Sequence, residues 1–158
     1  MDQPDKIDIT ELVNRSQAAA HAGLLSDSAL NNLTLWLTQS RYAEYVSGIG
    51  KAIGEESWQE LDDVFWRVIP FGTGGRRGRM HPFGSNVIND RTIGESAQGL
   101  AKYVLNTSAT QSTVNVRLSC AIGYDTRHQS RHFAELCAGI MVANGFHVYF
   151  LDEYRATP

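Results

Sequence analysis

A strand–helix–strand pattern near the C-terminal end constrains the fold of this chain more than any other feature. Apolar and polar residues alternate from Val114 to Ile122, which is typical of a half-buried strand. A helical pattern begins at Ser130, a good N-cap, and Asn144-Gly145 supplies a left-handed stop before a second apolar run, Phe146 to Leu151. A βαβ unit has parallel strands joined by a right-handed crossover. The sequence therefore predicts an α/β protein.

The stretch from Phe71 to Arg79 holds four glycines, one hydroxyl and three arginines in nine residues. Glycine permits positive φ and lets a ligand approach the backbone amides, and successive exposed amides make an anion-binding concavity. An arginine fork matches phosphate oxygens in pairs. The composition indicates a loop that binds a phosphoryl group, although a flexible surface turn can have the same composition.

Two common nucleotide-binding motifs do not describe this loop. It contains no Gly-x-x-x-x-Gly-Lys-Ser/Thr sequence, and Gly72-Thr73-Gly74-Gly75-Arg76-Arg77 lacks the third glycine of a dinucleotide fingerprint. A nucleotide-binding enzyme of another kind and a non-catalytic phosphate-binding or interaction module remain as alternatives.

The region before the loop is predicted to be helical. Ser26 caps a segment with an apolar side, helical spacing continues through the region around Tyr42 to Ile53, and a short third piece runs from Trp58 to Val64. After the loop, a strand at Val87-Ile88 is one possible return against Val68–Phe71. Thr92 and Glu95 have the spacing of a capping box at the start of a further helix, whose apolar stripe extends from Ile93 to Leu105.

Polar residues follow both predicted strands, where ligands of α/β sheets lie. Asp125 with Arg127, and Asp152 with Arg155, either orient arginines towards an anion or pair with each other; pairing is the favoured interpretation. His128, His132 and Glu135 have a spacing that can hold zinc, but the glutamate that the metalloprotease motif requires beside the first histidine is missing, so a surface or capping role is favoured.

Composition and charge bear on the remaining questions of nucleic-acid binding, membrane spanning and location. The net charge of −3 gives no electrostatic support to general nucleic-acid binding, and no apolar run is long enough to span a bilayer. Cys120 and Cys137 are predicted to be reduced and buried, in a strand and a helix, so a cytoplasmic location is predicted.

The order of these motifs resembles one family. The Phe71–Gly78 segment resembles the Phe-Gly-Thr-Ser/Ala/Gly-Gly-Leu-Arg-Gly signature that opens the first domain of the α-D-phosphohexomutases, with Arg76 in place of leucine. Ile122–Arg127 resembles the Gly-Tyr/Arg-Asp-x-Arg element, and Ala156-Thr157-Pro158 resembles the Thr-Pro step after the next strand. The helical lead-in is similar to the branch that includes phosphopentose-active members.

The resemblance implies a fold and a set of site residues. Residues 64–158 would form a three-layer α/β/α first domain, with a mixed sheet that is incomplete here, and residues 1–63 a helical extension. Thr73, Gly74, Gly75 and Arg77 would bind phosphate, with Arg77 contacting the phosphoryl group as it moves. Asp125 and Arg127 would brace the cleft.

The resemblance also implies a reaction. Members of the family pass a phosphoryl group between a serine and a sugar monophosphate through a sugar bisphosphate, which also serves as activator, and they bind Mg²⁺. No Ser-His-Asn-Pro-like loop and no Asp-Gly-Asp-x-Asp-Arg pattern occurs in this sequence. We therefore expect an N-terminal fragment that is inactive alone, with metal ligands beyond Pro158. The expected partners are a phosphosugar and the remaining domains of the same chain, and neither nucleic acid nor membrane.

Overall fold

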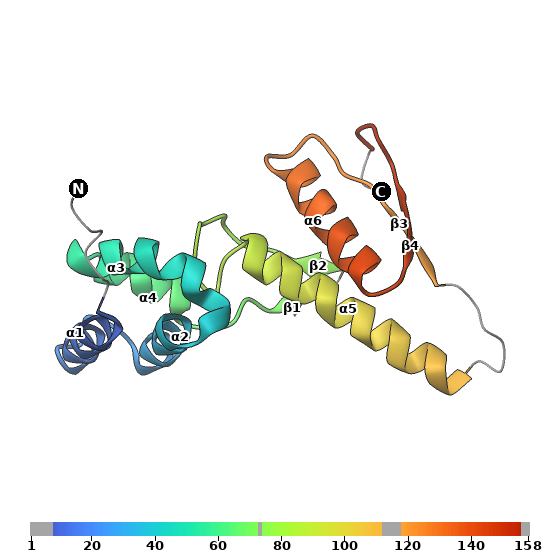
Figure 1. The fold of residues 1–158 in the computed structure, drawn as a ribbon. Helices are drawn as coiled ribbons and strands as arrows, with labels where there is room; N and C mark the ends of the chain where they lie inside the picture. Colours follow the sequence, from blue (N-terminus) through green and yellow to red (C-terminus); the bar gives the residue numbers. More distant parts are fainter. Residues whose placement is uncertain (1–7, 73, 112–117, 156–158) are drawn as a thin grey trace, which may run out of the picture. The chain divides into compact units, whose positions relative to one another are not determined.

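The computed structural model describes residues 8–72, 74–111 and 118–155. Within these ranges the chain divides into two compact units, one through Asn89 and one from Asp90, and each is described by itself (Figure 1). Helices together with a parallel strand pair confirm the α/β class.

Helices make up most of the first unit. They are α1 (Ile9–His21), α2 (Asp27–Thr38), the 3₁₀ helix η1 (Ser40–Tyr45), α3 (Val46–Gly54) and α4 (Trp58–Phe65). Ser26 caps α2 as predicted, since its hydroxyl accepts from the Ala29 amide at 3.3 Å. Asp8 caps α1 in the same way, with its carboxylate accepting from the Thr10 amide at 2.9 Å.

Aromatic side chains hold the first unit's core together. The Trp36 ring stacks on Tyr42 with 4.5 Å between centroids and meets Phe65 edge-on at 5.5 Å. All three are buried, as are the leucines and isoleucines on the inward faces of the helices. The apolar stripes found in the sequence therefore have the structural role that their helical spacing indicates.

The segment after α4 folds back onto that helix. The Asn86 amide donates to the Val64 carbonyl at 2.9 Å, and Phe83 and Val87 join the helical core. Gly84 makes this approach possible: its φ is +116°, and a Cβ there would lie 2.7 Å from the Val64 backbone oxygen.

The predicted return of Val87-Ile88 against Val68–Phe71 is wrong. Ile88 forms an isolated bridge with Met80, and Phe71 pairs with Arg76 in a tighter hairpin. Ser85, earlier in the returning segment, does reach the apolar run, where its carbonyl accepts from the Ile69 amide at 2.7 Å. A short loop closes at a smaller entropy cost than a long one, which favours the local pairing.

The second unit consists of α5 (Asp90–Gln111), β3 (Ser119–Ile122), α6 (Ser130–Ala143) and β4 (His147–Phe150). Strands β3 and β4 are parallel, with Ser119 opposite His147 and Ile122 opposite Phe150, as the βαβ pattern predicts. The part of the predicted strand from Val114 to Arg117 lies outside the described residues. Helix α6 packs on β4 and on α5, around buried Ala101, Met141 and Phe146.

Two predicted helix starts are wrong, that of α5 by three residues and that of α6 by one. Helix α5 begins at Asp90, so Thr92 lies inside it, and Glu95 pairs with Arg91 at 2.7 Å instead of closing a capping box. Helix α6 has Gln129 (φ +56°) at its N-cap, which leaves Ser130 as the first helical residue. The predicted stop of α6 is confirmed, because Gly145 has φ +86°.

Candidate functional site

The glycine-rich stretch forms a tight antiparallel hairpin. Strand β1 (Phe71–Gly72) pairs with β2 (Gly75–Arg76), so that Gly72 lies opposite Gly75 and the chain reverses between them. Gly74 has φ +78°, a conformation that side-chain-bearing residues rarely adopt. Thr73 lies outside the described residues. The glycines are therefore in an exposed turn and not in a helix, which leaves Gly74 open to a ligand.

The sequence in and around this hairpin is rich in arginine and contains no acidic residue. Between Val64 and Asn89 the chain has four arginines, Arg67, Arg76, Arg77 and Arg79, and no aspartate or glutamate. Arg77 is exposed and makes no ion pair with another described residue, whereas Arg76 is half-buried. A positive turn with one projecting guanidinium is suited to a small multivalent anion.

Packing of the apolar lead-in fixes the base of the hairpin. Of the run Val68–Phe71 only Ile69 is buried, and a Cβ on Gly78 would come 2.9 Å from the Ile69 Cδ1 atom. Gly78 therefore lies close to the end of the Ile69 side chain, which would have to shift to admit a larger residue. Phe71, in contrast, is 68% exposed.

The second predicted element follows β3 in the other unit. The Asp125 carboxylate accepts from the Arg127 amide at 3.1 Å and from the Arg127 Nε at 2.7 Å. The Arg127 amide is the main cause of a lowered Asp125 pKa. The Ser130 hydroxyl accepts from the Asp125 amide at 3.2 Å. Ser130 therefore helps to hold the loop before α6, although it is not the N-cap of that helix. Asp125 and Arg127 thus satisfy each other, the interpretation favoured from the sequence.

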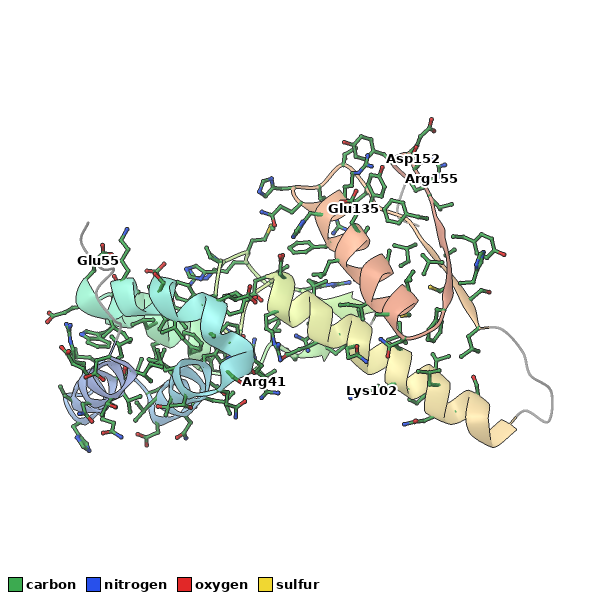
Figure 2. The ribbon with its side chains drawn as sticks, in the orientation of Figure 1. Arg41, Glu55, Lys102, Glu135, Asp152 and Arg155 are labelled. Atoms are coloured by element: carbon green, nitrogen blue, oxygen red, sulfur yellow. The ribbon has the colours of Figure 1, made fainter. Side chains whose placement is uncertain are left out.

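The pair predicted after β4 does not form. Arg155 lies 3.4 Å from Glu153, and the Asp152 carboxylate lies 3.9 Å from Arg131. Asp152 and Arg155 are labelled in Figure 2. Tyr124 holds this end of the strand pair, because its buried hydroxyl donates to the Asp152 carbonyl at 2.7 Å. The ends of β3 and β4 are therefore joined through Tyr124 and not through a pair between Asp152 and Arg155.

The described residues offer no metal centre. No group of three or more histidine, cysteine, aspartate or glutamate side chains is placed to hold an ion in the ranges that the structure covers. His132, one of the histidines considered for zinc, lies 2.7 Å from the Asp90 carboxylate. Cys120 and Cys137 are free and half-buried, less buried than predicted, and burial raises the pKa of the Cys137 thiol. In the same ranges no helix has the length and apolar character needed to cross a bilayer.

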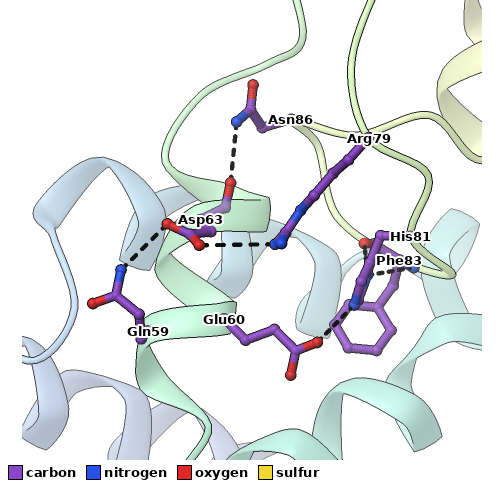
Figure 3. Close-up of polar contacts among 7 residues, drawn as sticks. All are labelled: Gln59, Glu60, Asp63, Arg79, His81, Phe83 and Asn86. Atoms are coloured by element: carbon purple, nitrogen blue, oxygen red, sulfur yellow. Dashed lines mark hydrogen bonds and ion pairs between the residues drawn. The ribbon is translucent and has the colours of Figure 1, made fainter.

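Two polar contacts between α4 and the segment that follows the hairpin were not predicted from the sequence (Figure 3). His81 and Arg79 reach Glu60 and Asp63 on α4, at 3.0 and 4.0 Å. Glu60 and Asp63 are three residues apart and therefore share one helical face, a signal that is visible in the sequence. Their partners are not visible there, because the hairpin must first fold back. Ser85 is buried and donates to the Arg67 carbonyl at 2.8 Å.

Comparison with known proteins gives one family. The family model described as phosphoglucomutase/phosphomannomutase, alpha/beta/alpha domain I, matches residues 68–158. A probable phosphoribomutase of Schizosaccharomyces pombe is 33% identical over 110 residues, covering 70% of this chain and 18% of the relative. The phosphoribomutase of Saccharomyces cerevisiae is 30% identical over 129 residues, 80% of this chain and 20% of the relative. Human phosphopentomutase is 28% identical over 140 residues, which cover 87% of this chain and 23% of the relative.

The matched region makes up most of this chain but only a small part of each relative. The chain spans about a fifth of the length of the curated relatives that it matches. No solved structure matches it. The family match begins at Val68, directly before the hairpin.

Proposed function

The chain belongs to the phosphoglucomutase/phosphomannomutase family, and from this premise we propose that it supplies the phosphate-gripping part of a phosphosugar mutase. The whole protein would interconvert a sugar 1-phosphate and its 6- or 5-phosphate. A serine of that protein would carry the phosphoryl group, and a sugar bisphosphate would be both intermediate and activator. The names of the relatives include glucose-, ribose- and pentose-type mutases, so the sugar is left open.

One observation carries this proposal: the exposed hairpin with Gly74 at positive φ and Arg77 projecting from a stretch that contains no acidic residue. Phosphoryl transfer depends mainly on holding the group in place and neutralising its charge. Thr73, Gly74 and Gly75 would supply backbone amides, and Arg77 would contact the moving phosphoryl group. Neither task needs a titrating side chain.

Asp125 and Arg127 would have a supporting role. Their mutual hydrogen bonds leave the Arg127 side chain 78% exposed, with its position set by Asp125. We propose that this pair braces the cleft and takes no part in proton or phosphoryl transfer.

The described residues do not fit a magnesium site, since they contain no cluster of candidate ligands. Mg²⁺, if the whole protein uses it, would be held by residues outside this chain, and no step proposed here depends on it. Because the sequence also lacks the phosphoserine and metal motifs, the chain by itself would not turn over a phosphosugar. We place the protein in the cytoplasm, with its phosphosugar and the rest of its own polypeptide as partners.

Binding of inorganic phosphate and of glucose 1,6-bisphosphate to this chain tests the proposal directly, by calorimetry or by amide shifts at Gly74 and Gly75. We expect both anions to bind, the bisphosphate more tightly, and Arg77→Ala to weaken them about 10- to 100-fold, the range for a lost charge-assisted contact. Arg41→Ala is the matched control, because Arg41 is exposed on η1 in the same unit. Equal binding by the Arg77 variant and the parent would remove Arg77 from the site.

A further inference from the structure

The end of α6 contains the one Asn-Gly pair in the sequence, Asn144-Gly145. Gly145 has φ +86° and is exposed, while Asn144 is half-buried and forms the C-cap of the helix. Glycine has no Cβ, so the side chain of the residue before it can reach the glycine nitrogen with little steric hindrance. The pair that ends α6 is therefore also the pair in this sequence that is most prone to deamidation.

Deamidation of this pair needs only water. The Gly145 nitrogen attacks the Asn144 Cγ, its proton passes through solvent to Nδ2, and the Cγ–Nδ2 bond breaks, which releases ammonia and leaves a succinimide ring. Water then opens the ring, at Cγ to give aspartate or at the main-chain carbonyl carbon to give isoaspartate. No oxidant or reductant takes part. The rate then depends on how readily the Gly145 nitrogen reaches Cγ.

The backbone at this turn keeps the two reacting atoms apart. Asn144 has ψ 10°, which brings the Gly145 nitrogen close to eclipsing the Asn144 nitrogen and turns it away from Cβ. Ring closure needs the Gly145 nitrogen on the side of Cβ instead. The Gly145 amide also donates to the Val142 carbonyl at 2.9 Å, so its N–H is occupied. Attack therefore requires the last turn of α6 to open locally.

The side chain of Asn144 is held in place from a second helix. Gln98, on α5, donates from Nε2 to the Asn144 Oδ1, and the Asn144 Nδ2 donates to the Gln98 Oε1, both at 3.0 Å. Nδ2 also donates to the Ile140 carbonyl at 2.8 Å. Both N–H groups of the Asn144 amide thus have an acceptor, and its oxygen has a donor. Rotation of this amide towards the Gly145 nitrogen breaks all three hydrogen bonds.

We propose that Asn144 is a deamidation site that its amide pair with Gln98 holds closed in the folded chain. Aspartate has no side-chain N–H, so after conversion the Gln98 Oε1 and the Ile140 carbonyl lose their donor and face a carboxylate. Isoaspartate lengthens the main chain directly before Phe146, which belongs to the core of the second unit. Either product therefore loosens the packing of α6 on α5, which lie side by side (Figure 1). This inference does not depend on the proposed function.

Peptide mass spectrometry of the chain, kept at mildly alkaline pH, tests the site. The quantity measured is the fraction of each asparagine converted to aspartate or isoaspartate with time, in buffer and in concentrated urea. In urea, Asn144 should convert before any other asparagine. The folded chain should convert it at least about tenfold more slowly, the combined factor of three net hydrogen bonds at the low end of their usual strength.

Gln98→Met isolates the amide pair, because methionine has a similar length and helix propensity but forms neither hydrogen bond. We expect the folded variant to convert Asn144 about fivefold faster than the parent, the factor for two such bonds, with an unchanged rate in urea. Lys102→Met is the matched control, since Lys102 is exposed on the same helix, and it should behave as the parent. Circular dichroism checks that both variants are folded.

Three results would overturn the proposal. A folded Gln98→Met chain that converts Asn144 at the parent's rate would remove the role of the amide pair. A folded parent that converts Asn144 as fast as the chain in urea would remove the protection, and this comparison stands even if the Gln98 variant fails to fold. Conversion of another asparagine ahead of Asn144 in urea would remove the site itself.

Discussion

Gly84→Ala is the most informative single change in the first unit, because it tests how the segment after the hairpin is seated on α4. Gly84 has φ +116°, and an added Cβ would lie 2.7 Å from both the Cβ and the backbone oxygen of Val64. Val64 is fully buried, and its carbonyl already accepts from the Asn86 amide. Neither partner can move away without disturbing the core.

The structure gives two additive costs for this substitution. Holding a non-glycine residue in that region of φ costs about 1–3 kcal/mol. Overlap with a packed backbone costs about 1–3 kcal/mol more. We therefore expect the free energy of unfolding to fall by about 2–6 kcal/mol, a large share of the roughly 5–15 kcal/mol of a typical domain.

Urea unfolding followed by tryptophan fluorescence is the assay. All three tryptophans, Trp36, Trp58 and Trp66, belong to the first unit, so their emission reports that unit alone. Gly54→Ala is the matched control, because Gly54 ends α3 with no atom within 4 Å of an added Cβ, and it should change stability by no more than about 1 kcal/mol. A Gly84 variant that unfolds within about 0.5 kcal/mol of the parent would refute the packing argument.

Three further predictions concern the hairpin and the strand ends. In the whole protein, Arg77→Ala should lower turnover by about 10²–10³, the loss seen when one charge-stabilising donor is removed; a steady-state assay that finds turnover within twofold would withdraw Arg77 from the chemistry. The lowered Asp125 pKa stabilises the fold at neutral pH and ceases to do so as pH falls through that pKa, so Asp125→Asn should destabilise the second unit at pH 7 and match the parent in strong acid, as followed by circular dichroism. Tyr124→Phe should cost about 0.5–1.5 kcal/mol in urea unfolding, because the buried hydroxyl donates to the Asp152 carbonyl; an unchanged midpoint would show that this hydrogen bond contributes nothing.

Local patterns predicted the elements whose ends are decided by neighbouring residues. Ser26 caps α2 and Gly145 stops α6, because each acts within one helical turn of its own position. The parallel pairing of β3 and β4 was also predictable, since one helix between two strands allows few other arrangements. The starts of α5 and α6 were not, because Thr92 lies inside α5 and the Ser130 hydroxyl accepts from the Asp125 amide.

The candidate site, too, could be predicted from the sequence only in part. The glycines and arginines between Phe71 and Arg79 predict an anion-binding loop; the structure shows an exposed turn there, and its binding of an anion stays a prediction. The mutual pairing of Asp125 with Arg127 is consistent with their spacing of two. The roles that the family resemblance gives to these residues stay predictions until binding and turnover are measured.

The sequence by itself determined the α/β class, the parallel strand pair and the family, because these depend on periodicity and on motifs of a few adjacent residues. Only the tertiary structure decided that Gly84 must lie against Val64 and that His81 must meet Glu60. Both contacts join residues about twenty positions apart, and such contacts exist only after the segment behind the hairpin has packed on α4. That packing depends on the shape of the whole core, which no local pattern encodes.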